Sequence, residues 1–199
     1  MQRLKSIKLY FFSILKLFFL SFRNFYLKSS FYNKKLITFI PDRIFYSPST
    51  YLSASLTTIN SDFYKITDTA PELLWKTKIK DKLKLENLHS FLWLARLDRK
   101  NSKTSTKNII RSWINIFYNY DPYTWEAEIT AKRIIAWSSN TDITLEDSDK
   151  IYKENFFLCL IKQSNFLLRN LNSIFYAPTK IISCAAIILS GIIFKENDS

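Results

Sequence analysis

The sequence predicts an all-α fold, and three observations favour this class. Apolar residues recur at helical spacing in five successive stretches after residue 85. No stretch in that part of the chain alternates apolar and polar residues as a half-buried strand does. The chain contains 1 glycine, which excludes the glycine-rich phosphate loops of P-loop and dinucleotide-binding folds. With 199 residues, 47% of them apolar, one packed domain is expected.

The N-terminal segment, residues 1–30, is predicted to be a basic amphipathic helix. Its apolar run from Leu9 to Phe22 has 14 residues and contains Lys16, whereas a membrane-spanning helix needs about 20 apolar residues. No small-residue cleavage site follows the run. The location of the protein stays open, with a cytoplasmic or peripheral membrane location favoured over secretion.

The charge of the chain is concentrated near its start. The 29 basic and 17 acidic residues give a net charge of +12. Residues 1–50 hold +8 of it, because their only acidic residue is Asp42 against nine cations: Arg3, Lys5, Lys8, Lys16, Arg23, Lys28, Lys34, Lys35 and Arg43. A basic surface attracts nucleic acid, anionic lipid and acidic polysaccharide alike. Nucleic acid ranks last, since the cations belong to an apolar helix and to no recognisable nucleic-acid motif.

Two alternatives remain for this basic helix. It can lie in a membrane interface, with its aromatic residues at the acyl boundary and residues 1–40 contacting anionic headgroups. It can instead pack its Phe/Leu face on the domain and keep its lysines in water, as most amphipathic helices do.

The body of the chain divides into an irregular part and a helical part. Residues 31–85, with Pro41, Pro48 and Pro71, are predicted to be a connecting region. Residues 86–199 are predicted to form five helices: 86–97, a second from about Thr104–Thr106 to Asp121, a third from a Thr124 cap to 138–141 with Glu126 and Glu128 in its first turn, 148–171 and 179–194.

The burial pattern of these helices can also be predicted. In the fourth helix the expected buried residues are Ile151, Phe157, Leu158, Ile161, Leu168 and Leu171. The fifth is apolar nearly all round, which indicates a helix surrounded by others or a membrane segment, and its length favours the first. Trp93, Trp113 and Trp137 are expected in the core.

Metal and cofactor sites are not expected. Cys159 and Cys184 lie in apolar runs, where a cysteine is usually a small buried hydrophobe. With one histidine, His89, and no CxxC or HxxxH spacing, the sequence provides no zinc ligand set.

Several helices carry sequence patterns in a recognisable order: Leu88-His89-Ser90-Phe91-Leu92-Trp93-Leu94, Ile110-Arg111-Ser112-Trp113-Ile114, Trp125, Thr130-Ala131-Lys132-Arg133-Ile134-Ile135-Ala136-Trp137, Gln163 with Leu167, and Ala185-Ala186-Ile187 with Gly191. In this order they resemble the N-terminal helical region of bacterial heparinase II/III-family proteins, over roughly residues 70–194. The resemblance implies an incomplete α/α toroid of antiparallel helices, normally followed by a β-sandwich domain, in lyases that cleave uronate-containing polysaccharides by β-elimination.

The same resemblance bears on activity. In lyases of this family an Asn-His pair precedes the helix that corresponds to 179–194, and those positions are Pro178 and Thr179 here. The catalytic tyrosine and the metal-bearing sandwich of such enzymes would lie beyond Ser199. We therefore expect a front fragment that is inactive alone, assign no catalytic residue, and expect it to need the missing part or a partner chain.

Candidate substrate-binding residues are Tyr123, Trp125 and Arg133, which can provide an aromatic platform and a guanidinium for a uronate carboxylate. The competing interpretation is that Arg133 pairs with Glu126, Glu128 or a helix end. His89 is expected to be a hydrogen-bonded structural residue. The alternative to a lyase fragment is a non-enzymatic, membrane-associated binding module.

Overall fold

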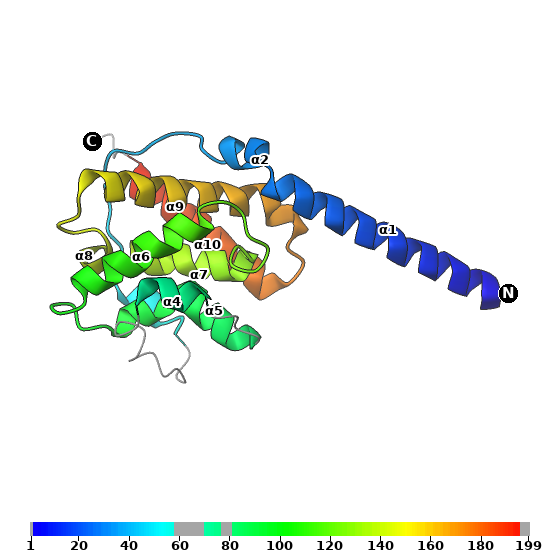
Figure 1. Cartoon of the computed structure of the whole chain (residues 1–199), viewed down its shortest axis with the longest axis horizontal. Helices are drawn as coiled ribbons and strands as arrows, with labels where there is room; N and C mark the ends of the chain where they lie inside the picture. The colour runs from blue at the N-terminus through cyan, green and yellow to red at the C-terminus, as the bar shows by residue number, and fades with distance from the viewer. Residues whose placement is uncertain (1, 58–69, 77–80, 196–199) are drawn as a thin grey trace.

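A computed structural model describes residues 2–57, 70–76 and 81–195. Its regular elements in these ranges are all helical, so the all-α prediction is confirmed (Figure 1). Parts of the predicted connecting region, 58–69 and 77–80, lie outside the described residues, as do residue 1 and 196–199. The elements are α1 (Gln2–Lys28), α2 (Ser30–Lys35), α3 (Tyr51–Ala54), α4 (Pro71–Lys76), α5 (Lys82–Ser90), η2 (Leu92–Arg96), α6 (Lys103–Phe117), α7 (Ala127–Ser138), α8 (Thr141–Thr144), α9 (Lys150–Asn170), η3 (Leu171–Ser173) and α10 (Ala177–Phe194).

Helix α7 lies at the centre of the domain. Nine of its 12 residues are buried, because α5, α9 and α10 pack around it. The Trp137 ring meets the Trp113 ring of α6 edge-on at 5.5 Å and stacks on Phe156 of α9 at 5.2 Å. Trp93, Trp113 and Trp137 are all buried, as predicted. Large aromatic side chains bury much apolar surface, so this cluster contributes strongly to the stability of the core.

The helix starts follow local capping. Asp149 begins α9, and its side chain accepts a hydrogen bond from the Tyr152 N–H at 2.9 Å. The prediction that Thr124 caps the third helix is wrong, because the N-cap residue of α7 is Glu126. Thr124 instead belongs to a turn in which its N–H donates to Asp121 Oδ1 at 2.8 Å.

The predicted helix over 86–97 is also corrected. Helix α5 begins earlier, where the Asp81 carboxylate accepts a hydrogen bond from the Leu83 N–H at 2.9 Å, and it ends at Ser90. Phe91 then adopts a left-handed conformation with φ 58°, and a 3-10 helix follows. The Phe91 ring is fully buried and stacks on the Trp93 ring, with 5.4 Å between the ring centres. Side-chain burial therefore holds a backbone conformation that a residue with a Cβ rarely adopts.

The buried face of α9 differs in part from the prediction. Phe157 and Ile161 are buried, and Leu158 and Leu171 are half-buried. Ile151 and Leu168, however, are mostly exposed. The buried face instead follows the side of α9 that meets α7 and includes Tyr152, Phe156, Leu160, Gln163 and Leu167.

Helix α10 packs on α7 and α9 with one face only. Ile181, Ile188 and Ile192 on its other face are 70%, 63% and 49% exposed, so the helix is not surrounded as predicted. By length and composition α10 could also cross a membrane, but core helices of soluble proteins meet the same two criteria. In this structure 39% of the helix is buried. The described part of the chain thus leaves an apolar flank of α10 uncovered.

Helix α1 projects from one end of the domain (Figure 1). Among its described side chains, Leu27 near its end is buried, while Phe11, Phe18, Phe22 and Phe25 are each more than half exposed. The alternative in which this helix packs its Phe/Leu face on the domain is therefore contradicted for the described side chains.

Candidate functional site: a buried arginine and a surface hollow

Arg133 occupies the centre of the helical domain and is completely buried. Its Nε donates to Gln163 Oε1 at 2.7 Å, and its Nη1 donates to the carbonyl oxygens of His89 and Thr124, both at 2.9 Å. Its Nη2 lies 3.4 Å from Thr130 Oγ1. The guanidinium therefore connects α7 with α9, with the end of α5 and with the turn before α7.

Neutral partners surround this buried charge. The guanidinium carbon lies 4.1 Å from the centre of the Trp113 ring, a cation–π contact. Burial lowers the pKa of Arg133 to about 9, so the group still carries its charge at neutral pH. Backbone carbonyls and an amide oxygen supply the negative dipoles that offset the loss of water.

His89 belongs to the same centre. Its Nδ1 accepts a hydrogen bond from Trp113 Nε1 at 3.0 Å, which fixes Nδ1 as the unprotonated nitrogen. Burial, and then the charge of Arg133, lower the pKa of His89 to about 3. The interpretation of His89 as a hydrogen-bonded structural residue agrees with this geometry.

A second buried cation, Lys162, lies nearby on α9. Its Nζ donates to the Tyr118 carbonyl oxygen at 2.8 Å and to Asn119 Oδ1 at 2.9 Å, and it lies 3.6 Å from the centre of the Tyr118 ring. Burial lowers the pKa of Lys162 to about 8. Lys162 thereby links α9 to the segment that follows α6 through hydrogen bonds. The sequence did not predict this contact.

The structure does not bring Tyr123, Trp125 and Arg133 together at a surface. Tyr123 is 70% exposed, whereas Trp125 is completely buried and donates from Nε1 to the Phe117 carbonyl oxygen at 2.9 Å. In this arrangement a ligand in solution can reach only Tyr123 of the three. Arg133 pairs with neither Glu126 nor Glu128 but binds the carbonyl oxygen of His89 near the end of α5, the helix-end interpretation.

The positions of the missing Asn-His pair lie at the start of α10. Pro178 is in its first turn, where the absent N–H costs nothing, and Thr179 Oγ1 donates to Glu128 Oε2 at 2.8 Å. Thr179 thus links α10 to α7. Cys159 is buried and accepts a hydrogen bond from Gln163 Nε2, while Cys184 is half-buried; both are free thiols.

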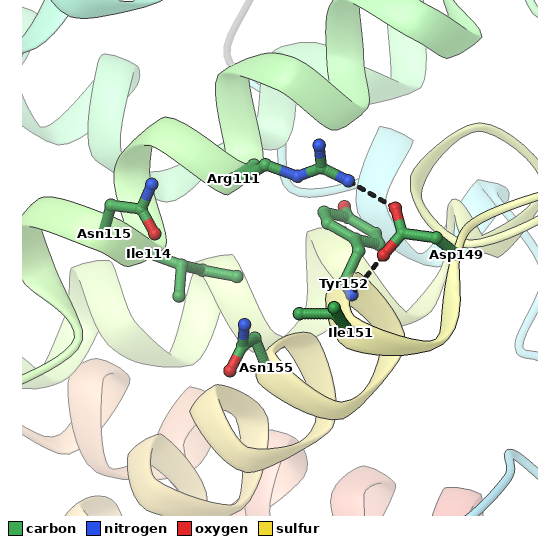
Figure 2. Close-up of a pocket in the computed structure, with 7 residues that line it drawn as sticks. All are labelled: Arg111, Ile114, Asn115, Asp149, Ile151, Tyr152 and Asn155. Atoms are coloured by element: carbon green, nitrogen blue, oxygen red, sulfur yellow. Dashed lines mark hydrogen bonds and ion pairs between the residues drawn. The ribbon is translucent and has the colours of Figure 1, made fainter.

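An open hollow of about 420 Å³ lies on the surface between α6 and α9 (Figure 2). Arg111, Asn115 and Ile114 line it from α6, and Asp149, Ile151, Tyr152 and Asn155 line it from the start of α9. Arg111 Nη2 pairs with Asp149 Oδ2 at 2.5 Å. Figure 2 marks no hydrogen bond from the amides of Asn115 and Asn155 to the other residues drawn. The hollow therefore offers one guanidinium and two amides to a polar ligand.

Sequence patterns contained a partial signal for this hollow. Arg111 and Asn115 are four residues apart on α6 and share its polar face. Nothing in the sequence, however, indicates that this face lies beside the start of α9. Among the described residues no group of three or more histidine, cysteine, aspartate or glutamate side chains could hold a metal ion.

Comparison of the chain with family models, with curated proteins and with solved structures gives no match.

Proposed function

We propose that this chain is the helical front part of a polysaccharide lyase that acts on uronate-containing glycans by β-elimination, and that it supplies scaffold and substrate contacts without a catalytic group. The proposal includes the incomplete toroid of antiparallel helices that the resemblance implies. One observation carries it: segments that bear the resemblance, although far apart in sequence, meet at one buried centre.

The centre includes a residue from each of four such segments. Arg133 contacts the carbonyl oxygen of His89, the ring of Trp113 and the amide of Gln163. Two members of the pattern, Trp113 and Gln163, stabilise the buried charge of Arg133 through their side chains, and His89 contributes its backbone carbonyl oxygen. This supports kinship of fold with the lyases and explains why Arg133 is unavailable to substrate.

The uncovered flank of α10 supports the same proposal. Ile181, Ile188 and Ile192 form an apolar surface at the edge of the described helices. In a ring of helices, the next helix would cover such a surface and bury its apolar side chains.

Because Arg133 is buried, the substrate would contact the accessible side chains of the surface hollow instead. Arg111 can bind a uronate carboxylate in place of Asp149, and Asn115 and Asn155 can exchange hydrogen bonds with sugar hydroxyls. Neutralising that carboxylate lowers the cost of removing the adjacent proton.

The decisive experiment measures the ultraviolet absorbance of the unsaturated uronate product. The chain alone, given several acidic glycans, should produce no signal. The chain mixed with the protein that supplies the remaining helices and the sandwich should produce one. Turnover by the isolated chain would contradict the division of roles proposed here.

The contribution of the hollow is tested separately by glycan binding. Arg111→Ala should weaken binding of a polyuronate to the chain by about tenfold, since one charge-assisted pair is lost. Arg169→Ala, which removes an exposed arginine near the other end of α9, is the matched control and should leave binding unchanged. Equal loss in both variants would indicate attraction by net charge alone.

A non-enzymatic, membrane-associated binding module is the second candidate, and the exposed apolar side chains of α1 favour it. The product assay separates the two candidates, because a binding module gives no turnover with any added lyase part.

A further inference from the structure

The strongest unexplained surface of the molecule is α1. Along this helix Phe11, Ile14, Phe18, Phe22 and Phe25 follow one another at spacings of three or four residues and are all exposed. Such spacing places them on one helical face. Phe12 and Phe19, also exposed, lie elsewhere around the helix. Monomeric soluble proteins rarely leave so large a contiguous apolar surface in water.

Charge identifies what covers this surface. Residues 1–41 contain no acidic residue, so the whole of α1 and α2 is basic. A second copy of so basic a helix would repel the first, whereas anionic lipid attracts it. Lys8 directly precedes the apolar run and Lys16 interrupts it, which argues against a helix that crosses the bilayer and for one that lies in the headgroup region.

The base of α1 is fixed to the domain. Arg23 Nη2 donates to Asn170 Oδ1, at the end of α9, at 3.1 Å and to Ser173 Oγ, at the end of η3, at 3.2 Å. On α2, Asn33 accepts from the Tyr120 N–H at 3.0 Å and donates to the Leu27 carbonyl oxygen at 3.2 Å. The direction of α1 relative to the domain is therefore set by specific hydrogen bonds.

Next to this joint the loop between η3 and α10 exposes two more aromatic side chains. Phe175 is 94% exposed and Tyr176 is 68% exposed, two and three residues beyond the Ser173 contact. The loop between η3 and α10 lies at the end of the domain from which α1 projects (Figure 1). Exposed aromatics of this kind prefer the membrane interface, where Phe contacts acyl chains and the Tyr hydroxyl reaches water.

We propose that α1 and the loop residues Phe175 and Tyr176 form one membrane-contact surface, which binds anionic lipid at two points and thereby fixes the orientation of the helical domain on the bilayer. The membrane contact of α1 rests on the second candidate function, the membrane-associated binding module. The contact of the loop with the membrane and the fixed orientation of the domain go beyond that function.

The test is co-sedimentation of the full chain with vesicles of phosphatidylcholine alone and of phosphatidylcholine with about one third phosphatidylglycerol. The wild type should sediment with the anionic vesicles and lose this binding as salt is raised. Phe18→Ser with Phe22→Ser should lower the partition coefficient by about tenfold or more, and Phe175→Ser with Tyr176→Ser by a smaller factor of about five.

The control is Tyr46→Ser with Tyr51→Ser. Both residues are large and exposed. Tyr46 follows Phe45, whose N–H donates to the Ile193 carbonyl oxygen at 2.9 Å, at the opposite end of α10 from Phe175 and Tyr176 and about 25 Å away for a helix of this length. This variant should bind as the wild type does. Circular dichroism should give the same helix content for all variants, since every substituted side chain is exposed.

Each outcome decides between the parts of the proposal. Loss of binding in the α1 variant with unchanged binding in the loop variant overturns the loop contact and leaves attachment by α1. Unchanged binding in both overturns the proposed surface and leaves the second candidate function standing through another part of the chain. A wild type that sediments with neither kind of vesicle overturns the proposed surface and the second candidate function together. A stable dimer without lipid that the α1 variant dissociates assigns the surface to a second copy of the chain and overturns the proposal.

Discussion

Helices α1 and α7 both contain aromatic residues and an arginine, but these side chains are exposed in α1 and buried in α7. Helix α1 exposes its phenylalanines and uses Arg23 at its base as a surface contact, whereas α7 buries Trp137 and places Arg133 at the centre of the core. The difference lies in what surrounds each helix, since α7 is packed by α5, α9 and α10 while most of α1 meets no other helix. Side-chain type therefore indicates the environment of a residue only once its neighbours are known.

The largest expected effect comes from removing the buried charge. Arg133→Leu should lower the free energy of unfolding by about 3–5 kcal/mol, because it leaves Gln163 Oε1 and two carbonyl oxygens buried without donors. Chemical denaturation measures the change. Arg111→Leu, at an exposed arginine, is the control and should be close to neutral. A loss in Arg133→Leu no greater than in the control would show that the centre contributes little.

An intermediate effect is expected at Lys162 as pH changes. Its pKa is lowered from 10.5 to about 8 in the folded state, so the unfolded chain binds more protons between these values. Lys162 should therefore make the free energy of unfolding rise as the pH increases from about 8 to 10.5, by about 3 kcal/mol in all, and should leave it unchanged with pH below about 8. The measurement is the difference between the wild type and Lys162→Met at each pH, which cancels most of the tyrosine titration. A difference independent of pH would contradict the lowered pKa.

The smallest effect on stability is expected in α1. Phe18→Ser with Phe22→Ser should change the free energy of unfolding in the absence of lipid by no more than about 0.5 kcal/mol, because neither ring contacts the core. Thermal unfolding followed by circular dichroism measures it. A clear destabilisation would mean that α1 packs on the domain in solution, and the contrast with α7 would disappear.

Much of the helical body could be predicted from the sequence. Helices α6, α7, α9 and α10 are predictable because each has 12 or more residues, over which apolar residues recur at helical spacing. Helices α2, α3 and α4 were missed because four to six residues carry too little periodicity and depend on tertiary contacts. The end of α5 was missed because apolar residues continue past Ser90, and no glycine marks the left-handed residue at Phe91.

The candidate site was less predictable than the fold. Arg133 stood out in the sequence, yet its partners His89 and Gln163 are 44 and 30 residues away, so its burial depends on how three helices meet. The Arg111–Asp149 pair joins residues 38 apart for the same reason. Helical periodicity gives the faces of single helices and does not specify which faces become neighbours.

The left-handed residue at Phe91 restricts which substitutions the chain can accept during evolution. Glycine would relieve the backbone strain but remove a ring that touches Trp93, Trp113 and Trp137, and an aliphatic residue would keep some volume but retain the strain. Another flat aromatic side chain would retain the strain as well, but it would keep the ring contacts that offset it, so drift at this position should be confined to phenylalanine and its nearest chemical equivalents.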